Sequence, residues 1–152
     1  MPEILLLNGP NLGILGRRQV HVYGTDTLAD IERAVAAEIA PEYKLAGVQR
    51  DGEGELIGAV QDHYHVAGAI VNPGALMIAG WGLRDALESF PAPWIEVHLS
   101  NVWARESFRH ESITAALSAG VIAGFGAHGY TLAAKALLRL LATRPTGSPE
   151  GG

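Results

Sequence analysis

Short runs of apolar residues recur along the chain, and turn-forming or polar residues end most of them. The runs occupy residues 3–8, 44–50, 68–72, 93–99 and 121–125. A short apolar run bounded by turn residues predicts a strand buried on both faces, as in a parallel sheet. Between the runs, apolar residues recur at helical spacing over residues 27–39, 53–66, 77–90 and 130–141. Alternating strands and helices predict an α/β fold, a flavodoxin-like three-layer sandwich with a five-stranded parallel sheet.

Local signals mark where several of these elements begin, weaken or end. Thr27 and Asp30 form a capping-box pattern, so a helix is expected to begin there. Gly80 and Gly82 weaken the helix expected over residues 77–90. No internal repeat or linker divides residues 1–142, which we expect to form one domain. Residues 143–152 are rich in Pro, Gly and polar residues and are expected to be a disordered tail.

Polar clusters follow three of the expected strands, at residues 8–11, 72–74 and 98–101. Because ligands of such folds bind beyond the carboxyl ends of the strands, these clusters predict a site at that edge of the sheet. Two connections, residues 9–26 and 100–120, are long for a compact domain, and long connections are more often functional than idle. The first carries arginines and a tyrosine among glycines, which predicts a mobile lid over an anionic substrate.

Tyr23 in this connection is a candidate base. A phenol with an ordinary pKa of about 10 is a poor base at neutral pH, but a nearby guanidinium favours the phenolate. Arg17, Arg18 and Arg105 are the candidates for that neighbour. An activated tyrosinate can remove a proton next to a carbonyl. The alternative is a tyrosine that only stacks on its loop.

His98 at the end of the fourth expected strand is a candidate acid. Glu96 precedes it by two residues, so strand alternation puts both side chains on the same face. A carboxylate that holds one ring nitrogen would orient the other towards a substrate. The alternative is a histidine that is buried in the core and hydrogen-bonded there.

Composition limits the remaining functions. The 152 residues carry a net charge of -5 and include no Cys, so disulfides, thiolate nucleophiles and Cys-metal sites are excluded. No basic stripe is present, and we expect no nucleic-acid partner. No apolar run reaches about 18 residues and the first residues lack a signal-peptide pattern, so we expect no membrane partner and a cytoplasmic location. No histidine has partners at ligand spacing, and no metal site is expected.

Seven segments together resemble the type II 3-dehydroquinate dehydratase family. They are residues 8–13, 16–18, 22–24, 53–57, 72–76, 83–87 and 95–101, in the family order within residues 3–141. The resemblance implies a flavodoxin-like fold and a homo-oligomer, a dodecamer of four trimers. It also implies stepwise anti elimination of water from a small cyclic hydroxyketone through an enolate, without a cofactor.

The resemblance also implies roles for single residues. Tyr23 would be the base, activated by Arg18 and Arg105, and Asn11 would hold the water that stabilises the enolate. His98, supported by Glu96, would protonate the leaving hydroxyl. Asp85 would enter the site from a neighbouring subunit. The other expected substrate contacts are Asn72, Gly74, Met77, Ile78, Leu99, Ser100, Trp103 and Arg109.

Several positions depart from the family pattern on the side that would recognise the ring. Where the family normally has Thr-His, this chain has Met77-Ile78, and the histidine lost at position 78 would bind ring hydroxyls. Residues 49–52 read Gln-Arg-Asp-Gly instead of Gln-Ser-Asn-His/Ser. These changes favour a less polar substrate, an aromatic or quinone-derived ring of specialised metabolism. Two alternatives stay open: an ordinary 3-dehydroquinate dehydratase of the shikimate or quinate pathway, and a non-catalytic flavodoxin-like binding module.

Overall fold

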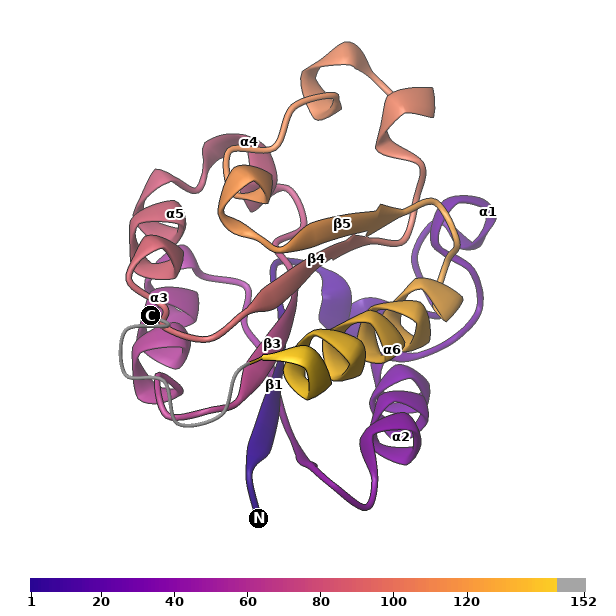
Figure 1. The fold of residues 1–152 in the computed structure, drawn as a ribbon. Helices are drawn as coiled ribbons and strands as arrows, with labels where there is room; N and C mark the ends of the chain where they lie inside the picture. Colours follow the sequence, from indigo (N-terminus) through magenta and orange to yellow (C-terminus); the bar gives the residue numbers. More distant parts are fainter. Residues whose placement is uncertain (145–152) are drawn as a thin grey trace.

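The computed structural model describes residues 1–144, which contain one five-stranded sheet. Figure 1 shows helices on both sides of this sheet. The strands are β1 (Glu3–Asn8), β2 (Lys44–Gln49), β3 (Gly68–Asn72), β4 (Trp94–His98) and β5 (Gly120–Ala123). All neighbouring pairs are parallel, and the strand order is β2-β1-β3-β4-β5. This order confirms the predicted flavodoxin-like α/β fold.

Helices cover both faces of the sheet, and alternate residues of β1 contact opposite layers. Ile4 and Leu6 belong to the core shared with α2 (Leu28–Ile39) and α6 (His128–Thr143). Leu5 and Leu7 belong to the core shared with α3 (Glu53–Asp62) and α5 (Trp81–Glu88). Because successive strand side chains point to opposite faces, a strand between two helical layers is apolar at every position.

The expected capping box at the start of α2 is present. The Asp30 backbone N–H donates to Thr27 Oγ1 at 3.1 Å, and the Thr27 backbone N–H donates to Asp30 Oδ2 at 2.9 Å. These bonds satisfy two backbone donors that have no partner inside the helix. The sequence therefore specified the beginning of this helix locally.

Two helix predictions were wrong in extent. The helix expected over residues 53–66 ends at Asp62. The helix expected over residues 77–90 is two helices, α4 (Leu76–Ala79) and α5, separated by Gly80 with ψ of 64°. A Cβ at residue 80 would lie 2.8 Å from the Leu76 carbonyl oxygen, so only glycine fits this break. Gly80 thus does more than weaken a helix: it ends one and begins another.

The boundaries at the carboxyl end also differ from expectation. The fifth strand was expected over residues 121–125 and lies one to two residues earlier. The last helix begins at His128 rather than residue 130 and continues through Thr143. The tail expected from residue 143 therefore starts inside a helix, and residues 145–152 lie outside the described part of the chain.

Both long connections lie beyond the carboxyl ends of their strands. The connection after β1 contains the 3-10 turn η1 (Leu12–Ile14) and the short helix α1 (Val20–Tyr23). The connection after β4 contains η2 (Val102–Ala104), η3 (Ser107–Arg109) and η4 (Ala115–Leu117). Over residues 1–144, no helix has the length and apolar character needed to cross a membrane.

Candidate active site

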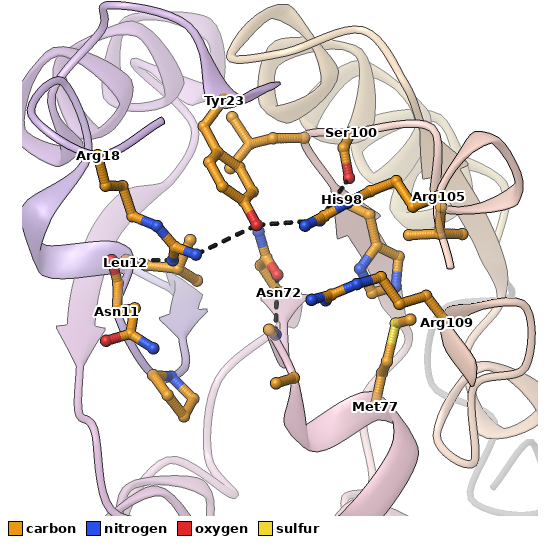
Figure 2. Close-up of a pocket in the computed structure, with 15 residues that line it drawn as sticks. Asn11, Leu12, Arg18, Tyr23, Asn72, Met77, His98, Ser100, Arg105 and Arg109 are labelled. Carbon is orange, nitrogen blue, oxygen red and sulfur yellow. Dashed lines mark hydrogen bonds between the residues drawn. The ribbon is translucent and has the colours of Figure 1, made fainter. Parts of the chain in front are cut away.

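A cavity of about 170 Å³ lies at the carboxyl ends of β1, β3 and β4, where the sequence predicted a site. The two long connections and the β3–α4 turn form its walls (Figure 2). Most of the expected site residues line it: Asn11, Arg18, Tyr23, Asn72, Gly74, Met77, His98, Leu99, Ser100, Arg105 and Arg109. The fold thus gathers residues from three separate segments of the chain.

The Tyr23 hydroxyl lies between two guanidinium groups (Figure 2). It accepts hydrogen bonds from Arg18 Nη2 at 3.2 Å and from Arg105 Nη1 at 2.9 Å. The Arg18 guanidinium carbon also lies 4.2 Å from the centre of the tyrosine ring. Charged donors at one oxygen stabilise negative charge on it. Of the three candidate arginines, the structure therefore brings Arg18 and Arg105 to Tyr23.

His98 is held by a carboxylate with no exposed surface. His98 Nε2 lies 2.8 Å from Glu96 Oε2. Because the carboxylate can only accept, Nε2 carries the hydrogen and donates. Ser112 Oγ donates to the same oxygen at 2.7 Å, and Thr114 Oγ1 donates to the other oxygen of Glu96. A buried carboxylate requires such donors because it has lost its hydration. The arrangement fixes the imidazole ring, and Nδ1 is the ring nitrogen that stays available to the cavity.

Asn11 begins the connection after β1 in the left-handed backbone region, with φ of 68° and ψ of 0°. Its backbone N–H donates to Asp51 Oδ1 at 2.9 Å, and its carbonyl accepts from Arg18 Nη1 at 3.5 Å. Gln49 Nε2 donates to the same Asp51 oxygen at 3.0 Å. These donors, the Asn11 backbone first and then the Gln49 side chain, hold the pKa of the Asp51 carboxyl below its usual value.

Asn72 is tied to a buried polar network beneath the cavity. Its Nδ2 donates to the Tyr130 hydroxyl at 2.9 Å, and that hydroxyl donates to Asn8 Oδ1 at 2.6 Å. The Gly74 backbone N–H donates to Asn72 Oδ1 at 3.0 Å, which fixes the orientation of the amide. Burial raises the pKa of Tyr130, so its hydroxyl stays a donor at any working pH.

Arg109 gives the cavity a third guanidinium besides Arg18 and Arg105. Its Nε donates to Glu106 Oε2 at 2.6 Å, and Figure 2 shows the guanidinium directed into the cavity on the side of Asn72. Three guanidinium groups around a small cavity favour an anionic ligand. Residues 1–144 contain no group of three or more His, Asp or Glu side chains placed to hold a metal ion.

Three expected site residues do not line this cavity. Ile78 is half-buried and follows Met77 in the single turn of α4, where Met77 faces the cavity. Successive side chains of a helix point about 100° apart, so Ile78 points in a different direction from Met77. Trp103 is exposed and borders a smaller neighbouring cavity behind His98. Asp85 is exposed on α5, and its expected role involves a second subunit, so that role stays a prediction.

Several residues that support the site were not identified from the sequence as candidates. Ser112 and Thr114 hold Glu96, and Tyr130 holds Asn72. Asp51 belongs to residues 49–52, which depart from the family pattern, but the sequence did not predict its hydrogen bond with Asn11. All four act through contacts between distant segments, for which an isolated sequence has no local signal.

Comparisons with known proteins agree along nearly the whole chain. A family model described as dehydroquinase class II matches residues 2–138. A 3-dehydroquinate dehydratase from Gloeobacter violaceus is 47% identical and the alignment covers 93% of this chain and 90% of that protein. A protein of the same name from Alkalilimnicola ehrlichii is 46% identical, with 99% of each chain covered.

Solved structures give the same result. The type II dehydroquinase from Propionibacterium acnes superposes with a TM-score of 0.84 at 39% identity, covering 93% of this chain and 97% of that one. The type II dehydroquinase from Butyrivibrio crossotus superposes with a TM-score of 0.85 at 34% identity, covering 93% and 98%. The fold therefore agrees with that of two type II dehydroquinases.

Proposed function

Since the chain belongs to the dehydroquinase class II family, and is thus a dehydratase and a carbon–oxygen lyase, we propose that it converts 3-dehydroquinate to 3-dehydroshikimate. One observation in this structure supports the proposal. The Tyr23 oxygen, between two guanidinium groups, lines the same cavity as a histidine oriented by a buried carboxylate. A base and an acid in one cavity are what elimination of water from a β-hydroxyketone needs.

In the first step, the Tyr23 phenolate takes a proton from the carbon next to the ketone. The electron pair of that C–H bond moves to the ketone oxygen and gives an enolate. Arg18 and Arg105 stabilise the anionic form of Tyr23 before the transfer. Asn11, at the cavity wall, holds a water that donates to the enolate oxygen.

In the second step, the enolate collapses and the carbon–oxygen bond of the β-hydroxyl breaks. His98 Nδ1, in its protonated form, gives its proton to the departing hydroxyl, which leaves as water. Glu96 keeps the ring in place and stabilises its positive charge. The proton on Tyr23 returns to His98 through solvent, so the cycle needs no oxidant, reductant or cofactor.

Recognition of the substrate falls to the remaining residues of the cavity. The backbone amides of Leu99 and Ser100 bind the substrate carboxylate, and Arg109 reaches the ring hydroxyls. Asn72 keeps one amide hydrogen beyond its bond to Tyr130, and this hydrogen faces the departing hydroxyl. We further propose that the site is completed in a homo-oligomer, with Asp85 supplied by a neighbouring subunit.

A less polar ring is the second candidate substrate, and Met77 is the observation that favours it. Its thioether is buried in the cavity wall where the family normally has a threonine. Two facts favour 3-dehydroquinate instead. Relatives at 46–47% identity carry that substrate in their names, and Ile78, the more radical replacement, does not line the cavity. The three guanidinium groups also suit a polar anion better than an apolar ring.

The test is the absorbance of the conjugated enone as purified protein meets 3-dehydroquinate. We expect turnover at a rate typical of enzymes, a kcat in the range of about 1–1000 per second. Turnover at least about a thousandfold below that range would sink the assignment. In that case the same protein should be assayed with hydroxyketones that lack ring hydroxyls.

A further inference from the structure

Hydrogen bonds hold both the backbone N–H and the backbone carbonyl of Asn11. Left-handed conformations of non-glycine residues persist only where the surroundings hold them. Here the N–H of Asn11 donates to Asp51, and the carbonyl accepts from Arg18 and from the Ile14 backbone N–H at 3.4 Å. Because Arg18 also donates to Tyr23, the contacts form a continuous path from Asp51 to the proposed base.

We propose that Asp51 is a positioning residue, which anchors the lid segment, residues 9–24, by holding the left-handed turn at Asn11. Its carboxylate is exposed and touches no reacting atom, so it acts through Asn11 and Arg18. The anchor sets the position of the Asn11 side chain at the cavity wall. Its effect on catalysis rests on the proposed function, whereas its effect on the lid does not.

Gln49 strengthens the anchor. Its Nε2 donates both to Asp51 Oδ1 at 3.0 Å and to the Gly9 carbonyl at 3.0 Å. Asp51 therefore receives two donors, one from the lid and one from the end of β2. A Cβ at Gly13 would lie 2.9 Å from Gln49 Oε1, so the lid turn approaches this side chain closely.

The position of Asp51 two residues before α3 offers a different explanation, which the geometry disfavours. An acidic residue near a helix start can serve as its cap or stabilise its dipole. The cap position of α3 is Gly52, with no side-chain cap hydrogen bond, and Glu53 and Glu55 already supply negative charge to the first turn. The hydrogen-bonding oxygen of Asp51 is directed at the lid and not at the helix.

The experiment compares Asp51→Ala, Asp51→Asn and the control Asp62→Ala. Asp51→Asn keeps an oxygen that can accept from the Asn11 N–H, whereas Asp51→Ala removes it. Asp62 is also an exposed aspartate, and it is the last residue of α3. Two properties are measured: the rate of tryptic cleavage after Arg17 and Arg18 in the lid, followed by mass spectrometry, and kcat and KM for 3-dehydroquinate.

We expect Asp51→Ala to raise the cleavage rate about tenfold and to lower kcat about tenfold with little change in KM. A loss in kcat at constant KM marks an interaction used in the transition state, as expected for the enolate-stabilising water at Asn11. Asp51→Asn and Asp62→Ala should behave like the parent protein, with the melting temperature of all three unchanged.

Parent-like cleavage and kcat in Asp51→Ala would overturn the proposal, as would an Asp51→Asn variant as impaired as Asp51→Ala. If the parent protein does not turn over 3-dehydroquinate, the proposed function fails. The cleavage rates then still decide whether Asp51 anchors the lid.

Discussion

The side of the cavity that carries Tyr23 and His98 is dense in polar contacts, whereas the side formed by α4 presents a thioether and backbone. Two arginines meet at Tyr23, and three side chains donate to the carboxylate behind His98. On the other side, Met77 is buried and its backbone carbonyl accepts from Ile113 at 2.7 Å, which fixes the chain but offers the substrate no polar group. We infer that changes on the first side alter catalysis and changes on the second alter substrate preference.

The largest expected effect comes from Tyr23→Phe, which removes the oxygen shared by the two guanidinium groups. We expect kcat to fall by about a hundred- to ten-thousandfold, the range of general base catalysis, with the melting temperature unchanged. Steady-state kinetics and thermal unfolding measure the two effects. Tyr43→Phe is the matched control, because Tyr43 is a partly buried tyrosine in the core packing away from the cavity. A Tyr23→Phe variant with full turnover would remove the assigned base and break the comparison.

An intermediate effect is expected from Tyr130→Phe, beneath Asn72. The change leaves Asn72 Nδ2 without its acceptor and Asn8 Oδ1 without its donor, in a region where Asn8 Nδ2 already has no partner within residues 1–144. We expect the free energy of unfolding to fall by about 1–3 kcal/mol, measured by chemical denaturation. Tyr64→Phe is the control, since its partly buried hydroxyl donates one hydrogen bond, to the Ala86 carbonyl, within residues 1–144. An equal loss of stability in both variants would mean that the Asn8–Tyr130–Asn72 network contributes no more to the free energy of unfolding than the single Tyr64 hydrogen bond.

The smallest effect is expected from Met77→Thr on the α4 side. A hydroxyl in place of the thioether should lower KM for 3-dehydroquinate by about fivefold or less and leave kcat nearly unchanged, because it adds a polar contact without touching the base or acid. Met77→Leu keeps the wall apolar at similar volume and serves as control. A loss in kcat as large as that of Tyr23→Phe would mean that both sides of the cavity take part in the chemistry.

Much of the fold could be read from the sequence because its signals are local. The apolar runs gave all five strands, and the Thr27–Asp30 capping box gave the start of α2. Helix boundaries were predicted less well: α3 ends at Asp62, before the expected residue 66, and Gly80 divides one expected helix into two through its close approach to the Leu76 carbonyl. The two-residue period of a strand also predicted that Glu96 and His98 lie on the same face, and the two side chains are hydrogen-bonded there.

The sequence by itself determined the elements, the edge of the sheet that carries the site, and the residue types available for an acid and a base. Only the tertiary structure decided which groups meet there. Arg105 reaches Tyr23 across 82 positions, Asp51 reaches Asn11 across 40, and Tyr130 reaches Asn8 across 122. It also decided that Met77 and not Ile78 forms the cavity wall. Periodicity reports how a residue faces its own strand or helix, whereas contacts between distant segments depend on how the loops close over the sheet.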